Sequence, residues 1–161
     1  MAMRKVISNT TPILSLFKID KLGILKELYD RVIIPFAVYE EIEQGKEKPY
    51  YQDLRKLDWI DIKSIKNEKS RLYFLDLDKG EAEVLILSGE ENADLVIIDE
   101  LLGRRYAKQM NINLTGTIGI LLKAKSKGII PSVKELLFEL REKGSWINPK
   151  LIMKILKLAG E

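Results

Sequence analysis

The stretch "KVISNTTPIL" (residues 5–14) joins a short β-branched run to a polar turn and the start of an apolar segment. Val6 and Ile7 have the β-branched side chains that strands favour. Thr11 and Pro12 are a favourable N-cap and first residue for a helix. The stretch therefore predicts a strand that leads directly into a helix, with Asn9 at the junction between them.

Short apolar runs alternate with helical periodicity along the rest of the chain, which is typical of an α/β fold with a mainly parallel sheet. Further strands are predicted at residues 32–34, 59–62, 94–98 and 112–114. Helices are predicted at residues 11–16, 20–28, 35–45, 49–57, 78–90, 101–110 and 115–127. Two more are expected to begin at the Ser132–Glu135 capping box and at Asn148, and residues 63–70 are expected to form an exposed loop.

The chain shows no internal repeat or linker, and its 161 residues suit one domain of the usual length, roughly 100–200 residues. We expect a single domain over residues 1–161, with 146–161 as a terminal amphipathic helix. Its apolar positions are Leu151, Ile152, Ile155, Leu156 and Ala159. This stripe is expected to pack either on the core of its own chain or on a second subunit or partner.

The composition excludes several kinds of chemistry, because the chain contains neither Cys nor His. Thiol nucleophiles, disulfides and catalytic triads with His are ruled out. The remaining carboxylates, hydroxyls and amides suit hard cations such as Mg²⁺ or Mn²⁺. The net charge of +3 is compatible with a polyanionic partner and equally with ordinary solubility.

No apolar stretch approaches the ~20 residues of a membrane span, and the N-terminal residues lack the apolar core of a signal peptide. We therefore expect a cytoplasmic protein with no membrane contact.

Polar side chains follow two of the predicted strands at their carboxyl ends, where open parallel sheets bind ligands. Asn9 follows the first strand and Asp99 follows the strand at 94–98, so the two converge if these strands are neighbours. Glu41 flanks the apolar stripe of its helix, and Glu81 lies in the first turn of another. These four residues are the candidates for a functional site.

Each candidate also has a structural interpretation. Asn9 can form an Asx turn or cap the helix that follows. Glu41 can be a solvated helix carboxylate, Glu81 can pair with Asp78 in a capping box, and Asp99 can cap the helix from residue 101. Independent roles of this kind would not require all four residues to face one end of one sheet.

Five segments occur in an order that resembles a known family: "VISNTTPILSLFKIDKLGIL", "IIPFAVYEEI", "LDKGEAEVLILS", "VIIDELLGRRYA" and "LTGTIGILL". Together they cover most of residues 5–122, and they resemble the PIN-domain nucleases, specifically the VapC-like branch of toxin ribonucleases. The resemblance implies a three-layer α/β/α fold in which acidic side chains bind Mg²⁺ or Mn²⁺ and RNA is hydrolysed. It also implies RNA as substrate, an antitoxin protein as a candidate partner, and a homodimer.

By position, the resemblance assigns metal-binding and catalytic roles to Asn9, Glu41, Glu81 and Asp99, with Glu100 as a fifth metal-site residue. The first of these positions is commonly Asp in the family and is Asn here. An Asn carbonyl can ligate a hard cation, but it supplies no negative charge to concentrate one.

Candidate substrate contacts lie close to Asp99 in sequence or at the next helix start. We expect one of Arg104 and Arg105 to be solvated and the other to contact phosphate. Thr115 and Thr117 can offer hydroxyl and N–H groups to the RNA, with a helix N-cap as the alternative role of Thr115. A further basic group is expected to be mainly solvated loop charge: Lys63, Lys66, Lys69 and Arg71.

The sequence therefore predicts a metal-dependent endoribonuclease in which bound cations activate a water and stabilise charge on the phosphate. The alternative is a PIN-like module that has lost efficient catalysis and binds RNA or a protein. Asn9 is the residue that favours this alternative.

Overall fold

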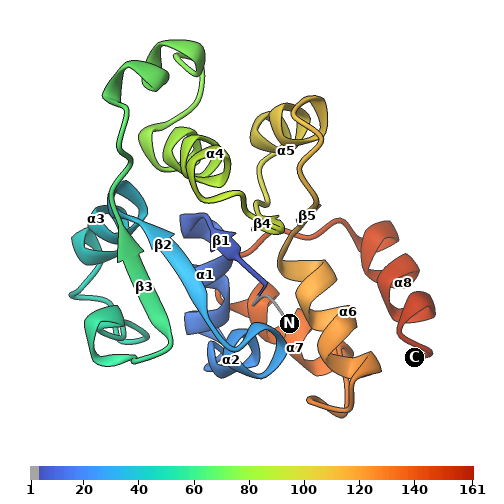
Figure 1. Cartoon of the computed structure of the whole chain (residues 1–161). Helices are drawn as coiled ribbons and strands as arrows, with labels where there is room; N and C mark the ends of the chain where they lie inside the picture. The colour runs from blue at the N-terminus through green and yellow to red at the C-terminus, as the bar shows by residue number, and fades with distance from the viewer. Residues whose placement is uncertain (1–3) are drawn as a thin grey trace.

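The computed structural model describes residues 4–161 and contains one sheet of five parallel strands in the order β3-β2-β1-β4-β5 (Figure 1). The strands are β1 (Val6–Ser8), β2 (Val32–Pro35), β3 (Ile60–Lys63), β4 (Leu95–Ile97) and β5 (Leu114–Thr115). Every pairing between neighbouring strands is parallel, which confirms the predicted sheet.

Helices enclose the sheet in a three-layer α/β/α arrangement (Figure 1). They are α1 (Thr10–Lys18), α2 (Gly23–Tyr29), α3 (Phe36–Gln44), α4 (Lys79–Glu91), α5 (Leu101–Gln109), α6 (Thr117–Ser126), α7 (Lys134–Glu142) and α8 (Pro149–Leu158), with the 3-10 turns η1 (Leu54–Lys56) and η2 (Glu68–Tyr73). Helices α4 and α5 cover one face, whereas α1, α2 and α6 cover the other. Helix α3 lies between α1 and α4, beside the end of β2.

The central strands are buried on both faces, which explains why they are continuous apolar runs instead of alternating ones. All residues of β1, β2 and β4 are buried. Helix α4 is likewise buried on every side from Gly80 to Ser88, so it forms the middle of its layer. Within residues 4–161, no helix combines the length and apolar character needed to cross a membrane.

The helices predicted at 49–57 and 115–127 differ in the structure. The helix predicted at 49–57 is only the single turn η1, because the Asp53 carboxylate accepts the N–H of Arg55 in a local bond that competes with a continuous helix. Thr115 belongs to β5, and Gly116 is the N-cap of α6.

The capping box predicted at Ser132 and Glu135 is also wrong, because a distant carboxylate occupies the start of α7. The Glu161 side chain accepts hydrogen bonds from the N–H groups of Val133 and Lys134 at 2.7 and 3.2 Å, and from the Ser132 hydroxyl at 2.6 Å. These donors lower the pKa of Glu161 to about 2.

Helix α8 packs against α6 of its own chain, with Ile152 and Ile155 buried. The Asn148 side chain caps it by accepting the N–H of Lys150 at 2.9 Å. Leu151, which was predicted to lie on the buried stripe, is 46% exposed because it faces a surface cavity.

Candidate functional site

The candidate site lies where β1 and β4 end side by side. These strands pair in register from Val6 with Leu95 to Ser8 with Ile97, and the Asn9 N–H donates to the Ile97 carbonyl at 2.9 Å. The chain leaves β1 for β2 on one side and returns to β4 on the other, so this is the point at which the strand order reverses. The two strands that Asn9 and Asp99 follow are therefore neighbours, as the prediction of their convergence requires.

The Asn9 side chain is buried, with 2% exposure. Its Nδ2 donates to Glu100 Oε2 at 3.1 Å, but its Oδ1 has no partner. Within residues 4–161, it is the one fully buried side-chain oxygen or nitrogen without a hydrogen bond. Asn9 occupies the N-cap position of α1, yet its side chain makes no capping bond, so capping does not explain this residue. A buried carbonyl without a partner costs about 1–3 kcal/mol.

Glu41 reaches the site from α3 and is half-buried between the starts of α1 and α4. It accepts hydrogen bonds from the Thr10 hydroxyl and from the Gly80 N–H, the latter at 3.2 Å. Burial raises the pKa of Glu41, partly offset by the Thr10 hydrogen bond. A freely solvated helix carboxylate is therefore not its role.

Glu81 is buried in the first turn of α4, with 6% exposure. Its backbone N–H donates to the Asp78 side chain at 2.8 Å, so Asp78 caps the helix as expected. Burial, with further contributions from Asp78, Glu100 and Glu41, raises the pKa of Glu81 to about 8. The capping bond uses the backbone of Glu81, and the Glu81 side chain makes a separate hydrogen bond with Asp78 that contributes to its raised pKa.

Asp99 caps a helix, but it is α6 and not α5 as expected. Its Oδ1 accepts the Thr117 N–H at 2.7 Å and its Oδ2 accepts the Thr117 hydroxyl at 2.6 Å. Burial raises the pKa of Asp99, while both Thr117 bonds lower it. The N-cap residue of α5 is instead Glu100, whose side chain makes no capping bond to the helix.

Glu100 links the group. It accepts hydrogen bonds from Asn9 Nδ2 and the Thr11 hydroxyl, and its charge raises the pKa of Glu41, Glu81 and Asp99. Glu100 thus connects Asn9 with the three other carboxylates, by a hydrogen bond to Asn9 and by the effect of its charge on Glu41, Glu81 and Asp99.

Three glycines, which were not predicted, make room for three of the carboxylates. A Cβ at Gly80 would lie 2.7 Å from a Glu41 oxygen, and one at Gly103 would lie 3.0 Å from a Glu81 oxygen. A Cβ at Gly116 would lie 2.6 Å from Asp99 Oδ1. Each glycine stands within the segments that carry the family resemblance, but its partner carboxylate comes from another element and is not visible in the sequence.

The four residues predicted to contact the substrate differ in exposure and in hydrogen bonding. Arg104 turns inward, donating to the Ile98 carbonyl at 2.8 Å, whereas Arg105 is exposed. Thr117 is engaged by Asp99, and the Thr115 hydroxyl lies against Gly119 of α6. These contacts with RNA remain predictions.

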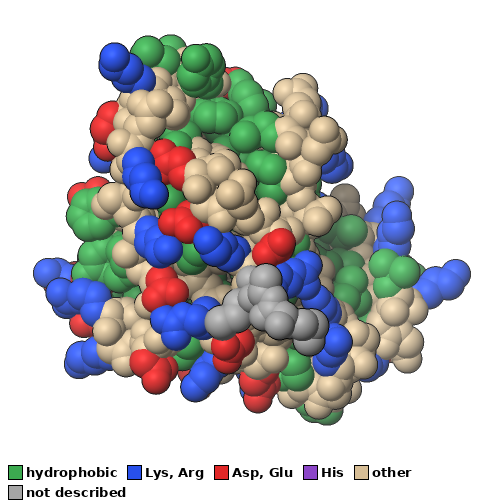
Figure 2. Space-filling view, viewed as in Figure 1, with side chains coloured by type: hydrophobic (Ala, Val, Ile, Leu, Met, Phe, Trp, Pro, Cys, Tyr) green, Lys and Arg blue, Asp and Glu red, His purple; other side chains and the backbone are tan. Residues whose placement is uncertain are grey.

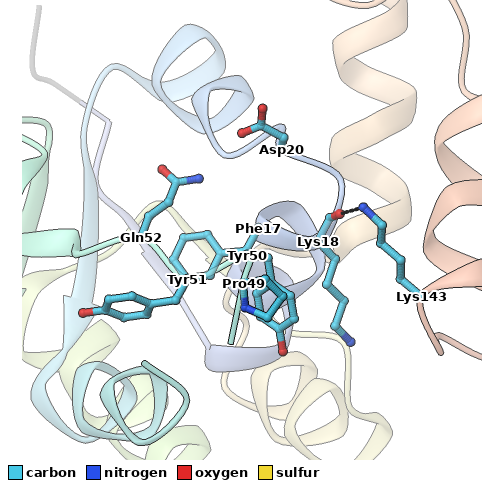
Figure 3. A pocket seen from close by; sticks show the side chains of 8 residues that line it. All are labelled: Phe17, Lys18, Asp20, Pro49, Tyr50, Tyr51, Gln52 and Lys143. Carbon is cyan, nitrogen blue, oxygen red and sulfur yellow. Dashed lines mark hydrogen bonds between the residues drawn. The ribbon is translucent and has the colours of Figure 1, made fainter. Parts of the chain in front are cut away.

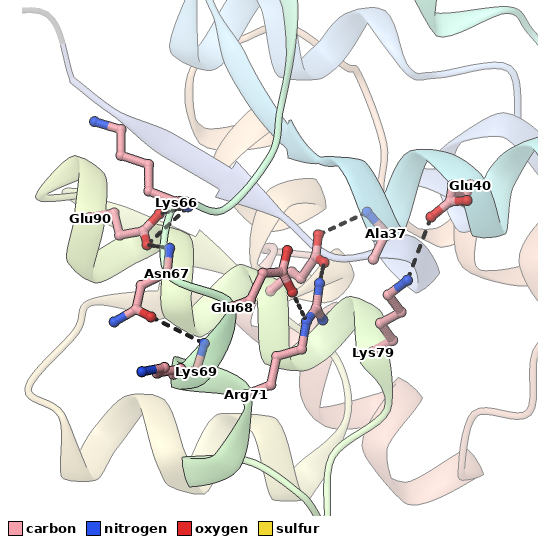
Figure 4. A network of polar contacts seen from close by, with 10 residues as sticks. Ala37, Glu40, Lys66, Asn67, Glu68, Lys69, Arg71, Lys79 and Glu90 are labelled. Carbon is pink, nitrogen blue, oxygen red and sulfur yellow. Dashed lines mark hydrogen bonds and ion pairs between the residues drawn. The ribbon is translucent and has the colours of Figure 1, made fainter.

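Arg71 is not solvated loop charge as predicted, because it pairs with Glu83 and Glu68 (Figure 4). Glu83 is buried and also accepts the Ala37 N–H at 2.9 Å, which joins α4 to the start of α3. The Glu90 side chain accepts the N–H groups of two residues in the same loop. The segment before α4 is therefore fastened to that helix.

Neither surface charge nor cavity volume alone identifies the candidate site. Lys and Arg side chains are interspersed with Asp and Glu on the face seen in Figure 2. A cavity of about 700 Å³ is lined by Phe17, Tyr50 and Tyr51 (Figure 3). It lies at the end of α1 opposite to Asn9.

The described carboxylates are not gathered as a ready-made metal cage: within residues 4–161, no three acidic side chains are grouped so that they could hold an ion. Glu41, Asp99 and Glu100 are instead each turned toward hydroxyl or amide donors.

Comparison with protein families gives a match over residues 5–161 to a family model described as a PIN domain. Comparison with curated proteins gave no match. The matched region spans nearly all of the sequence and contains the whole sheet and every candidate site residue. The chain therefore belongs to the PIN-domain family, whose members are generally nucleases that use divalent metal ions.

Proposed function

We propose that this protein is a metal-dependent endoribonuclease of the VapC-like toxin type, which hydrolyses RNA phosphodiesters at the edge of the sheet between β1 and β4. The observation that carries the proposal is the buried Asn9 Oδ1 without a partner, beside Glu100, whose charge raises the pKa of Glu41, Glu81 and Asp99. A cation would supply the partner that this oxygen lacks and would relieve the repulsion among the carboxylates.

The donor set fits Mg²⁺ or Mn²⁺, because it consists of carboxylate and amide oxygens. Mg²⁺ is usually held by one or two carboxylates together with waters and substrate phosphates. The residues that would hold it here are Asn9, Glu41, Glu81, Asp99 and Glu100. Such a cation, when bound, lowers the pKa of a water and stabilises charge on the phosphate.

Other residues of the chain would orient this site and the substrate. Thr10 and Thr117 hold Glu41 and Asp99 by hydrogen bonds. Arg104, which lies close enough to lower the pKa of Asp99, is the better placed of the two arginines for a phosphate beside that residue. Thr115 and Arg105 are proposed as outer contacts with the RNA strand.

The second candidate function is a PIN-fold module with weakened catalysis that binds RNA or a protein. Asn9 favours it, because an amide adds no negative charge and its Nδ2 donates a hydrogen bond to one of the carboxylates.

We also propose an antitoxin as partner, a homodimer as assembly and the cytoplasm as location. Exposed apolar side chains around η2 support a protein partner or a second copy, since exposed apolar patches commonly mark interaction sites. They include Leu72, Tyr73 and Leu75, each more than two-thirds exposed, and this end of the molecule is apolar in Figure 2.

The test is Mn²⁺-dependent cleavage of a mixed RNA pool by wild type, Glu41→Gln and Asp99→Asn. Glu40→Gln is the matched control, because Glu40 neighbours Glu41 but pairs on the surface with Lys79 at 3.8 Å. We expect cleavage by wild type and the control and its loss in both site variants. A wild-type protein that binds the RNA without cleaving it would establish the binding module instead.

A further inference from the structure

A second cavity opens directly onto the acidic site. Its volume is about 570 Å³, within the range of about 300–1,000 Å³ typical of small-molecule sites. Asp99, Thr11 and Thr117 line it on one side, and Trp146 and Leu151 are among its apolar residues. The cavity and the acidic site therefore share a wall, and one extended ligand can occupy both.

Trp146 is the most unusual residue of this cavity. Its side chain is 78% exposed, whereas the other tryptophan, Trp59, is 7% exposed and belongs to the core. The backbone around Trp146 is held in place, because Ile147 is buried and Asn148 caps α8. A large aromatic ring is thus exposed to solvent at a cavity that Asp99 also lines.

The lining chemistry favours a nucleobase over a phosphate. No Lys or Arg lines the cavity among the described residues, so it lacks the cations that bind phosphate. A base has apolar faces that stack on aromatic rings and polar edges that form hydrogen bonds. Ser15 can serve such an edge, since its hydroxyl-bearing side chain lines the cavity.

We propose that this cavity is a base-binding subsite, in which one unpaired nucleobase of the RNA stacks on Trp146 while an adjoining phosphate lies at the acidic site. The inference rests on the proposed ribonuclease function and adds the position on this chain that receives one base beside the cut. A base inside a duplex is stacked and paired on both sides, so it cannot enter the cavity without first being flipped out.

The first experiment uses free nucleosides, which carry no phosphate and so test the subsite without metal or cleavage. Trp146 fluorescence is recorded while adenosine, guanosine, cytidine or uridine is added to the full chain in the presence of a chelator. We expect saturable quenching by at least one nucleoside, and no response in Trp146→Phe, whose only tryptophan is buried. Absence of quenching by all four would overturn the subsite. A response to N-acetyl-leucinamide alone would also overturn it, since the cavity would then suit a protein side chain.

The second experiment compares cleavage of single-stranded RNA by Trp146→Ala, Trp146→Phe and Met153→Ala. Met153 is the control, because it is an exposed apolar residue of α8 that does not line the cavity. Loss of one stacked base is expected to raise KM about 5- to 150-fold with a smaller change in kcat, and Phe should restore most of the affinity.

The two hypotheses fail in different ways. An unchanged KM and unchanged base preference in Trp146→Ala, with normal cleavage, would overturn the subsite and leave the ribonuclease intact. If wild type cleaves no RNA, the proposed function fails, while nucleoside quenching would still support the subsite.

Discussion

At position 9, the exchange of a carboxylate for an amide changes both charge and hydrogen bonding. The Asn9 amide donates to Glu100 through Nδ2 and leaves Oδ1 free. An Asp at this position would lose the donor and place two carboxylates in contact. Asn9 therefore reduces the repulsion within the metal-free site, but it also reduces the attraction of the site for a cation.

We predict that Asn9→Asp binds Mn²⁺ more tightly than wild type, because it adds a carboxylate to an oxygen site. The metal-free variant should melt at a lower temperature, since Glu100 would gain a repulsive neighbour. Titration calorimetry with Mn²⁺ and thermal melts in a chelator measure the two effects. Unchanged or weaker binding by a folded variant would remove Asn9 from the metal ligands.

Glu81 makes a prediction about pH. Its folded-state pKa of about 8 lies above the ordinary 4.5, so the stability that its protonated form contributes is fully present below pH 4.5 and is lost as the pH rises through about 8. The metal-free protein should therefore melt at progressively lower temperature across this range. Mn²⁺ affinity should rise over the same range, because the cation competes with the proton.

Glu81→Gln should flatten both profiles, whereas Glu40→Gln should leave them as in wild type. A melting temperature of Glu81→Gln that falls with pH as steeply as that of wild type would show that another group is responsible.

At the scale of elements, the sheet was predictable because its buried strands are uninterrupted apolar runs rich in β-branched residues. The placement of Asn9 and Asp99 was predictable because they directly follow two of those strands. Local signals failed where a distant residue supplied the hydrogen bond. Ser132 has the sequence of a capping box, but Glu161 binds the start of α7 from the other end of the segment. Asp99 similarly caps α6, which follows a later strand. The three glycines that make room for Glu41, Glu81 and Asp99 could not be recognised for the same reason, since each carboxylate is distant in sequence from its glycine.

Alanine substitutions at two glycines of α4 distinguish the effect of helix propensity on stability from the effect of packing around Glu41 on metal binding. Gly89 has open space around its Cβ position, so Gly89→Ala should stabilise the fold by about 0.5–1 kcal/mol. Gly80→Ala should stay folded, because the clash falls on the flexible end of Glu41, but the displaced carboxylate should weaken Mn²⁺ binding about 10- to 100-fold. Denaturant melts and Mn²⁺ titrations test both. Equal Mn²⁺ affinity in the two variants would show that Gly80 has no part in placing Glu41.

The hydrogen bonds that Glu161 accepts at the start of α7 should make the stability of the protein depend on pH in the acid range. The lowered pKa of Glu161 contributes stability that is present above pH 4.5 and lost as the pH falls through about 2. Glu161→Gln should therefore melt below wild type near neutral pH, and the two should converge toward pH 2. Glu135→Gln is the control, since Glu135 is the residue that a local capping box would have used. A greater loss in this control than in Glu161→Gln would favour the local box.

At the scale of the whole molecule, we predict that truncation after Ser145 destabilises the protein without changing its assembly. The truncation removes the buried side chains of Ile152 and Ile155, each of which contributes about 1.5–3 kcal/mol to the free energy of unfolding. It also removes the hydrogen bonds of Glu161 to the start of α7. Thermal melts and light scattering report stability and mass. Ile155→Ala, compared with exposed Met153→Ala, isolates the packing of α8. A truncated protein that remains folded but dissociates from dimer to monomer would show that α8 binds a second subunit.

The pairing of β1 with β4 also sets the stage of folding at which the candidate site is assembled. Ile7 lies beside Val96, so the central strand pair closes a very long loop of chain, and such closure is entropically costly and slow. During synthesis, Asn9, Glu41 and Glu81 leave the ribosome well before Asp99. A nascent chain therefore carries an incomplete set of the proposed ligands until β4 has taken its place beside β1.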